Sequence, residues 1–339
     1  MSVRIWLMAV LAVVVAVCCA GAGAVERSKI TVYTSMENEL IRKLLADFSA
    51  KNPGIDVAIV RDSTGIITAR FMAEAENPRA DVLWQIAATS LISADQRKLL
   101  EPYAPRELSL IDPAFRDPAS PPAWVAGNAW MTAFACNTIE LEKRGLPAPK
   151  SYADLLDPKY KGLISISNPA SSGTGFLTVS GILQLMGEER GWAYLGALHK
   201  NVASYEHSGS KPAKMAASGE SVIGVSFCYA SLALKRKGAP LEVVFPAEGS
   251  GWEMEASALV RKAKISPAAR TFLDWASGKT AVALYGTSYG VVSRKDVETE
   301  RDGYPADVSK QMIKNDLVWA ANNRQRILDE WNRRFGAGK

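Results

Sequence analysis

Histidine and cysteine are scarce in this 339-residue chain, and their scarcity excludes several kinds of site. The chain has two histidines, His199 and His207, and four cysteines, of which Cys136 and Cys228 lie beyond the N-terminal segment. So few ligands do not make a convincing zinc site, and whether the two cysteines pair stays open. The chain also lacks a G-x-G-x-x-G after its first expected strand, the motif of dinucleotide-binding proteins. It has no long Lys/Arg block either, so its formal net charge of +5 does not indicate nucleic acid binding.

Two short motifs that suggest catalysis fail on their spacing. "GTSYG", residues 286–290, matches the nucleophile elbow around Ser288, but the histidine of that triad follows the serine in the chain, and both histidines here precede it. "GKT", residues 278–280, lacks the glycine that a phosphate loop needs five residues earlier, where Leu273 stands. The sequence therefore predicts a protein that is not an enzyme, with an exported serine hydrolase as the weakest alternative.

The N-terminal residues 1–24 are typical of a secretory signal peptide. An early arginine precedes an apolar run over 5–17, and the small residues before Val25 predict cleavage after Ala24. The run is shorter than the roughly 20 apolar residues that span a bilayer. The alternative is a lipoprotein signal that uses Cys18 or Cys19. Either way, we expect an exported protein, and the cleavable signal predicts a periplasmic one.

The first third of the mature chain alternates strands and amphipathic helices. Leu40, Ile41, Leu44 and Phe48 fall on one helical face after the first expected strand. A βαβαβ order predicts a mostly parallel, doubly wound sheet, in which ligands bind beyond the carboxyl ends of the strands. The expected strands are 30–33, 55–60 and 80–84, and the loops that follow them are 34–37, 62–65 and 85–90.

The stretch "NPASSGTGF", residues 168–176, is the strongest candidate for a binding site. It follows an expected strand at 163–166 and leads into the apolar helical run "FLTVSGILQLM". At such a turn the first N–H groups of the helix have no intrahelical partner, and together with the helix dipole they form an anion site. The hydroxyls of Ser171, Ser172 and Thr174 add donors, so we expect an anion to be held here without a fixed cation.

Four stretches carry a resemblance to a known family. They are "VRDSTG", "NPASSGTGFLTVS", "HSGSKP" and "VFPAEGSGWEMEA". The chain resembles the periplasmic solute-binding proteins of ABC importers, in the group that includes ferric-ion binders, and within that group it is most similar to 2-aminoethylphosphonate-binding proteins. The resemblance implies a type II-like fold of two α/β lobes with two crossing strands as a hinge, near 124–137 and 243–251. It implies one lobe from 25–125 plus 247–298 and another from 126–246 plus 299–339, and a monomer that partners an inner-membrane ABC permease.

The resemblance also allows a comparison of metal ligands. The positions that match the four iron ligands of the ferric relatives hold Glu37, Ile86, Cys228 and Tyr229 here. Since one tyrosine remains of the four expected ligands, the resemblance implies that the metal half of the site is lost and the anion half retained.

The predicted function is capture of 2-aminoethylphosphonate, with no metal and no cofactor. The alternatives are another phosphorylated solute, such as a sugar phosphate or phosphoglycerate, and Fe(III) with a synergistic anion. Glu37 is the first candidate for the ammonium group, with Tyr33, Tyr229 and Glu255 next. The residues expected to bind the ligand are Tyr33, Ser35, Glu37, Ser63, Thr64, Ala88, Ser171, Ser172, Gly173, Thr174, Ser208, Ser210 and Tyr229.

Overall fold

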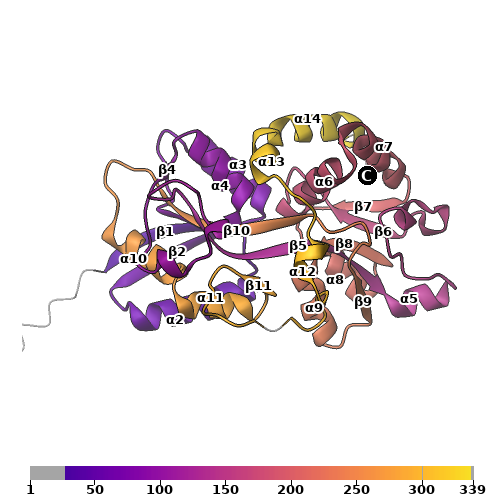
Figure 1. The fold of residues 1–339 in the computed structure, drawn as a ribbon, viewed down its shortest axis with the longest axis horizontal. Coiled ribbons are helices and arrows are strands. Elements are labelled where there is room, and N and C mark those ends of the chain that lie inside the picture. Colours follow the sequence, from indigo (N-terminus) through magenta and orange to yellow (C-terminus); the bar gives the residue numbers. More distant parts are fainter. Residues whose placement is uncertain (1–26, 300, 337–339) are drawn as a thin grey trace, which may run out of the picture.

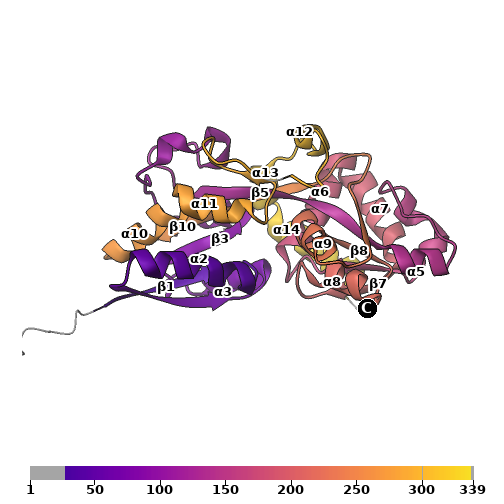
Figure 2. The same cartoon turned by 90° about the horizontal axis from the view of Figure 1, so that it is seen from below.

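Two α/β lobes lie side by side in the computed structural model, which describes residues 27–299 and 301–336 (Figure 1). Strands β5 (Val125–Asn137) and β10 (Trp252–Val260) run through the middle, where the lobes meet (Figure 2). The predicted fold class is therefore confirmed. The predicted signal peptide, residues 1–24, lies outside the described residues. Within the described ranges, every helix is too short or too polar to cross a membrane.

The helices and strands follow the order that the sequence predicts. In the first lobe they are β1 (Ser28–Thr34), α2 (Asn38–Lys51), β2 (Ile55–Arg61), α3 (Thr64–Ala73), β3 (Val82–Ala87), α4 (Ala88–Gln96), β4 (Leu100–Glu101), α10 (Pro267–Ala276), α11 (Lys279–Gly286) and β11 (Val291–Val292). In the second lobe they are α5 (Thr138–Lys143), β6 (Ile164–Ser167), α6 (Gly173–Met186), α7 (Glu188–His199), β7 (Val202–Glu206), α8 (Lys211–Ser218), β8 (Ile223–Phe227), α9 (Cys228–Arg236) and β9 (Leu241–Val244). The tail adds α12 (Val308–Gln311), α13 (Leu317–Asn322) and α14 (Arg324–Phe335).

Strand β5 connects the sheets of the two lobes. The strand order is β2-β1-β3-β10-β5-β8-β6-β7, with β4, β9 and β11 on the sides. The first part of β5 pairs with β10, and from Thr132 onward it pairs with β8 and β9. Strands β1, β2 and β3 pair in parallel, as do β6, β7 and β8. The carboxyl ends of both parallel sets therefore face the space between the lobes.

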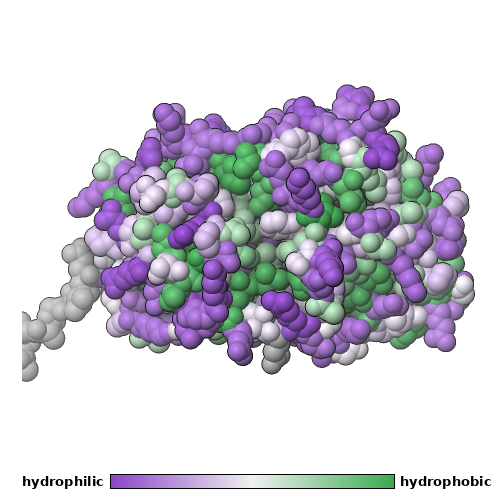
Figure 3. Space-filling model, viewed as in Figure 1, coloured by the Kyte–Doolittle hydropathy of each residue, from purple (hydrophilic) through white to green (hydrophobic). Residues whose placement is uncertain are grey.

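Helices cover both faces of the first-lobe sheet. Phe48 of α2 and Phe272 of α10 pack with their ring centroids 4.9 Å apart on one face, and Ile67 and Phe71 of α3 pack on the other. Strand β3 is buried along its whole length, as expected of a parallel strand between two helical layers. On the face in Figure 3, hydrophilic residues cover most of both lobes, and hydrophobic residues show mainly toward the middle.

The core of the second lobe contains one of the two described cysteines. Cys136 on β5 is buried beside Phe134, and Cys228 is buried at the start of α9, and both are free thiols. They do not form a disulfide. The amphipathic tail is divided at Asn323, where α13 ends and α14 begins. Helix α13 contacts α4 of the first lobe, whereas Trp331 of α14 packs into the second-lobe core.

Candidate functional site

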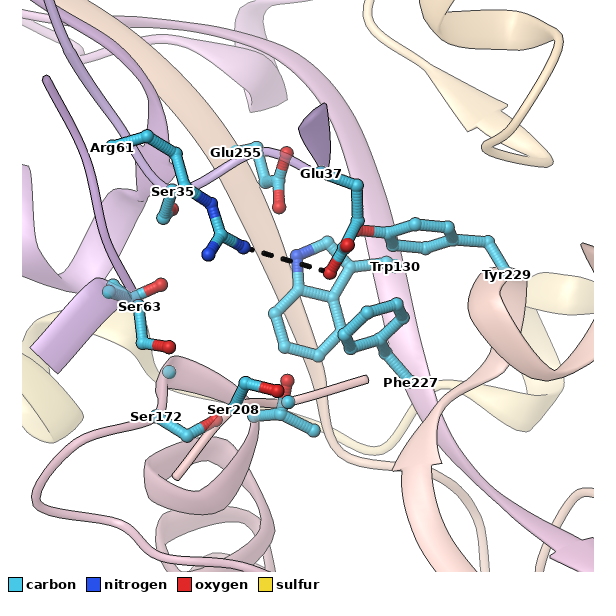
Figure 4. Close-up of a pocket in the computed structure, with 14 residues that line it drawn as sticks. Ser35, Glu37, Arg61, Ser63, Trp130, Ser172, Ser208, Phe227, Tyr229 and Glu255 are labelled. Atoms are coloured by element: carbon cyan, nitrogen blue, oxygen red, sulfur yellow. Dashed lines mark ion pairs between the residues drawn. The ribbon is translucent and has the colours of Figure 1, made fainter. Parts of the chain in front are cut away.

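A pocket opens between the lobes, where the loops after the parallel strands meet (Figure 4). Both lobes contribute to it, and so do β5 and β10, which run between them. Nine of the thirteen residues that the sequence analysis selects line it. The lining residues are Ser35, Glu37, Arg61, Ser63, Thr64, Trp130, Ser172, Gly173, Thr174, Ser208, Gly209, Phe227, Tyr229 and Glu255.

Arg61 places a fixed positive charge in the pocket, whereas the sequence predicts an anion held by the turn without a fixed cation. Its Nε donates to the backbone oxygen of Met36 at 3.0 Å, which holds the side chain against the loop after β1. Its Nη2 lies 3.8 Å from Oε1 of Glu37, and the terminal nitrogens donate to no described residue. Figure 4 shows the guanidinium pointing into the pocket. Beside its ion pair with Glu37, the guanidinium therefore has donors left for an anion in the pocket.

Two helices begin at the pocket, one in each lobe. Helix α6 starts after Ser172, whose hydroxyl caps it by accepting from the N–H of Gly175 at 3.3 Å. The N–H groups of Gly173 and Thr174 find no acceptor among the residues in the structure, and neither does the N–H of Thr64 at the start of α3. Because unpaired N–H groups and the helix dipole both favour negative charge, the two helix ends form an anion site.

Four hydroxyl groups at the same end of the pocket also lack protein partners. The hydroxyls of Ser63, Thr64, Thr174 and Ser208 form no hydrogen bond within the described chain, although Ser63 and Thr174 are only 6% and 4% exposed. Ser35 donates to the backbone oxygen of Gln85 at 3.3 Å. This density of donors, with Arg61 beside them, suits a group with several acceptor oxygens.

The opposite end of the pocket carries two carboxyl groups. Glu37 lies between two cations, Arg61 at 3.8 Å and Lys214 of α8 at 3.5 Å. Glu255 on β10 is buried, and its Oε2 accepts from the hydroxyl of Tyr289 at 2.7 Å. Burial raises the pKa of Glu255 to about 8, and the charges of Glu37 and Glu253 add to the shift.

Aromatic rings form the wall between the two ends. The rings of Phe227 and Tyr229 stack with centroids 4.3 Å apart, and the Trp130 ring meets Phe227 edge-on at 5.8 Å. Trp130 is buried, yet its Nε1 has no hydrogen-bond partner among the described residues. Since buried N–H groups are nearly always paired in folded proteins, this unpaired donor in the pocket wall is an exception.

Tyr33 and Ala88 do not line the pocket. Tyr33 points to the α3 face of the sheet, where its hydroxyl donates to Glu74 at 2.8 Å. Ala88 is buried at the start of α4, and Glu253 occupies that helix end by accepting from the Thr89 hydroxyl at 2.7 Å. The carboxyl group of Glu253 thus fills the helix start in the loop 85–90, the third of the predicted ligand-binding loops.

Ser171 and Ser210 lie next to the pocket without lining it. The Ser171 hydroxyl donates to the backbone oxygen of His207 at 2.8 Å, which fastens the turn to its neighbour. Ser210 precedes α8 and lines the adjoining groove along α2 and α9. The same groove contains Ser288, and neither described histidine reaches that serine, since His207 faces Asp62 and His199 faces Tyr205.

The sequence analysis misses four lining residues, Arg61, Trp130, Gly209 and Phe227. Arg61 lies within the "VRDSTG" stretch, as the last residue of β2, so its position beyond a strand end could have identified it. Gly209 lies within "HSGSKP". Trp130 and Phe227 belong to strands, and no local pattern distinguishes a strand residue that faces a pocket from one that faces the core.

The lobes touch directly beside the pocket. The N–H of Gly65 in α3 donates to the backbone oxygen of Ser171 at 3.0 Å. Two ion pairs also join the lobes, Lys214–Glu37 at 3.5 Å and Lys237–Glu39 at 3.2 Å, and the His207 ring lies 3.5 Å from Asp62. Exposed pairs of this kind contribute little to stability. The close approach of α3 to the turn before α6 is the direct backbone contact between the lobes at the pocket.

The sequence model of one bacterial protein family matches most of the chain. The family described as "Bacterial extracellular solute-binding protein" matches residues 77–311. An uncharacterized protein of Haemophilus influenzae is 31% identical over 313 residues, which cover 90% of each chain. A protein of Salmonella typhimurium, named as a candidate 2-aminoethylphosphonate-binding periplasmic protein, is 28% identical over 269 residues and covers 77% of this chain and 76% of its own.

A solved structure matches almost the whole fold. The periplasmic binding protein AfuA from Actinobacillus pleuropneumoniae, with exogenous fructose-6-phosphate bound, is 29% identical. It matches with a TM-score of 0.85 over 92% of this chain and 99% of its own. The likeness supports the two-lobed architecture and agrees with the family match.

We predict that Gly65→Ala weakens ligand binding while leaving the fold intact. A Cβ at Gly65 would collide with the backbone of Ala170 and lie 2.8 Å from the Ser171 carbonyl carbon in the other lobe. Alanine itself favours a helix by about 1 kcal/mol over glycine, so the variant should fold but close poorly. We expect calorimetry to show that Kd rises at least about tenfold. In X-ray scattering, the decrease in radius of gyration on adding ligand should be smaller than for the wild type.

The matched control is Gly196→Ala. Gly196 is a helical glycine in α7, and a Cβ there meets nothing within 4 Å. This variant should gain helix stability and keep its affinity. Equal affinity in the two variants would show that the lobes do not need this contact to hold a ligand.

We also predict that the ligand-free protein loses stability as pH rises from 6 to 8. A carboxyl whose pKa is raised by folding keeps its proton in the native state at pH values where the unfolded chain has lost it. The folded pKa of Glu255 is about 8. Below that pKa, Glu255 therefore lowers the free energy of unfolding by roughly 1.4 kcal/mol for each unit that the pH rises, and above it this contribution to the slope ends. Urea unfolding at several pH values should give a flatter curve for Glu255→Gln, and parallel curves would contradict the assignment.

Proposed function

The chain belongs to the bacterial extracellular solute-binding protein family, and within that family we propose that it captures a small organic phosphonate or phosphate. Proteins of this family bind a solute outside the inner membrane and deliver it to an ABC importer, and they are not enzymes. The observation that carries the proposal is that α3 and α6, from opposite lobes, begin at one pocket beside Arg61.

A phosphoryl group matches the donors at this end of the pocket. It offers three acceptor oxygens and one or two negative charges, whereas the pocket offers three unpaired N–H groups, four free hydroxyls and a guanidinium. Because these donors come from both lobes, the bound group would hold the lobes together as well as being held by them. The buried N–H of Trp130 is a further donor for a ligand oxygen.

We propose 2-aminoethylphosphonate as the first candidate ligand. It has a phosphonate at one end and an ammonium group two carbons away, and the pocket has a cationic end and a carboxyl end in one cavity. The rings of Phe227 and Tyr229 lie beside the carboxyl end, and aromatic faces attract cations. The named Salmonella relative supports this candidate as well.

A sugar phosphate is the second candidate, and one observation favours it. Glu37 already has two cations beside it, so it does not need an ammonium group and could accept hydrogen bonds from sugar hydroxyls instead. The AfuA structure contains fructose-6-phosphate. We expect Fe(III) to bind poorly, because Ile86 offers no oxygen and burial together with Glu255 raises the pKa of Tyr229 and Tyr289 above the ordinary value.

The proposal includes export by a signal peptide cleaved after Ala24. The motivation is the apolar run and the small residues that precede Val25. The intact mass of the protein recovered from the periplasm should equal that of residues 25–339. A diacylglyceryl group on an N-terminal cysteine would contradict this prediction.

The proposed function predicts which solutes stabilise the mature protein and which variant abolishes the effect. In a thermal-shift screen, 2-aminoethylphosphonate or fructose 6-phosphate should raise Tm more than inorganic phosphate, and ferric citrate should not raise it. Thr174→Val removes a hydroxyl that has no protein partner while keeping the shape of the side chain, so it should weaken each phosphoryl ligand roughly ten- to a hundredfold.

Thr178→Val is the control for this variant. Its hydroxyl donates to the backbone oxygen of Thr174 at 2.8 Å, one turn further along α6 and outside the pocket. Its affinity should stay within about threefold of the wild type. If Thr174→Val binds every phosphoryl ligand as tightly as Thr178→Val does, the turn is only a helix start and the proposed site is wrong.

A further inference from the structure

Glu255 is the one pocket-lining carboxyl of the described chain that has no cation beside it. Glu37, the other, is flanked by Arg61 and Lys214, whereas no lysine, arginine or histidine nitrogen of the described residues lies within 4 Å of Glu255. Its Oε2 accepts from Tyr289, and its Oε1 receives no hydrogen bond from the part of the chain described here. Glu255 is 7% exposed and lines the pocket.

The surroundings of Glu255 are acidic or neutral on every side. The hydroxyl of Tyr289, which follows α11, donates to Glu255 and lies 3.2 Å from the hydroxyl of Tyr229 of α9, so a chain of hydroxyls closes one side. The charges of Glu253 on β10 and Glu37 in the first loop raise the pKa of the Glu255 carboxyl. The charge of Glu255 in turn raises the pKa of Tyr285 on α11. The one cation that lines the cavity among the described residues is Arg61, whose guanidinium lies between the helix starts and Glu37.

We infer that Glu255 selects the body of the ligand by pairing, as a carboxylate, with a cationic amine. This inference rests on the proposed phosphoryl site, because the phosphoryl group anchors the ligand and so brings its other end to Glu255. An amine supplies the positive charge that this buried carboxyl lacks. Ethylphosphonate, which has a hydrogen atom in place of the amine, leaves Glu255 without a partner.

Pairing with an amine changes the protonation state of the site. In the ligand-free protein the buried carboxyl keeps its proton at pH 7, since its pKa is raised to about 8. The amine is already protonated in water, so forming the ion pair requires the Glu255 carboxyl to release its proton to the buffer. Tyr289 keeps its own proton and goes on donating to Oε2, which makes it a positioning residue. Binding of an aminophosphonate to the wild type therefore releases one proton from Glu255, which the same ligand cannot release when it binds to a protein that lacks this carboxyl.

Calorimetry on the mature protein tests this inference. 2-Aminoethylphosphonate and ethylphosphonate are titrated at pH 7 in two buffers of different ionisation enthalpy, which gives the number of protons released. We expect 2-aminoethylphosphonate to bind at least about tenfold more tightly than ethylphosphonate. We also expect its binding to the wild type to release up to about one proton more than its binding to Glu255→Gln, a comparison in which the protons of the ligand itself cancel. In Glu255→Gln the Kd of 2-aminoethylphosphonate should rise roughly ten- to a hundredfold, while that of ethylphosphonate changes less than about threefold.

Glu253→Gln is the matched control, because Glu253 is a buried carboxyl on the same strand that accepts from Thr89 outside the pocket. It should keep the preference for the amine, and because the charge of Glu253 contributes to the raised pKa of Glu255, it should lose only part of the extra proton. Equal weakening of both ligands in Glu255→Gln, or no extra proton in the wild type, would overturn the inference while leaving the phosphoryl site in place. If the wild type binds neither phosphonate, the proposed function fails and the inference fails with it.

Discussion

The backbone N–H groups at the starts of α3 and α6 are the constraint around which the rest of the site is arranged. These groups face a space between two lobes and have no acceptors within the described chain. Arg61 adds a full positive charge beside them. Donors in such a cleft are poorly hydrated, so the proposed anion would replace the lost water. Because the donors belong to both lobes, the proposed function couples capture of the anion to closure of the lobes.

The sheet explains why these helix starts meet. Both lobes are built from parallel strands whose carboxyl ends point toward the same gap. β5 connects the two sheets, and β10 pairs with β5 and β3, so side chains on these strands face the gap from behind. This arrangement gives Trp130 and Glu255 their positions at the back of the pocket. It also explains why the lobes approach most closely at Gly65, where the absence of a side chain allows two backbones to touch.

Sequence reasoning predicts the local parts of this site well and its long-range parts poorly. The serine, glycine and threonine residues 172–174 were recognisable because a strand, a polar turn and an apolar helix follow one another in the chain. Ala88 also begins a helix directly after a parallel strand, yet Glu253 occupies that helix start. Glu253 is 165 residues away and could not be linked to Ala88 from one sequence. Tyr33 was misplaced because the alternation of β1 does not say which face of the sheet looks toward the pocket.

The central claim is that a phosphoryl group binds between α3 and α6. A crystal structure of the secreted protein grown with 2-aminoethylphosphonate tests it most directly. The account predicts the phosphorus atom between the two helix starts, with its oxygens at hydrogen-bonding distance from the N–H of Thr174, the hydroxyl of Ser63 and the guanidinium of Arg61. A phosphonate bound outside this pocket, or bound with its amine at the helix starts, would contradict the account.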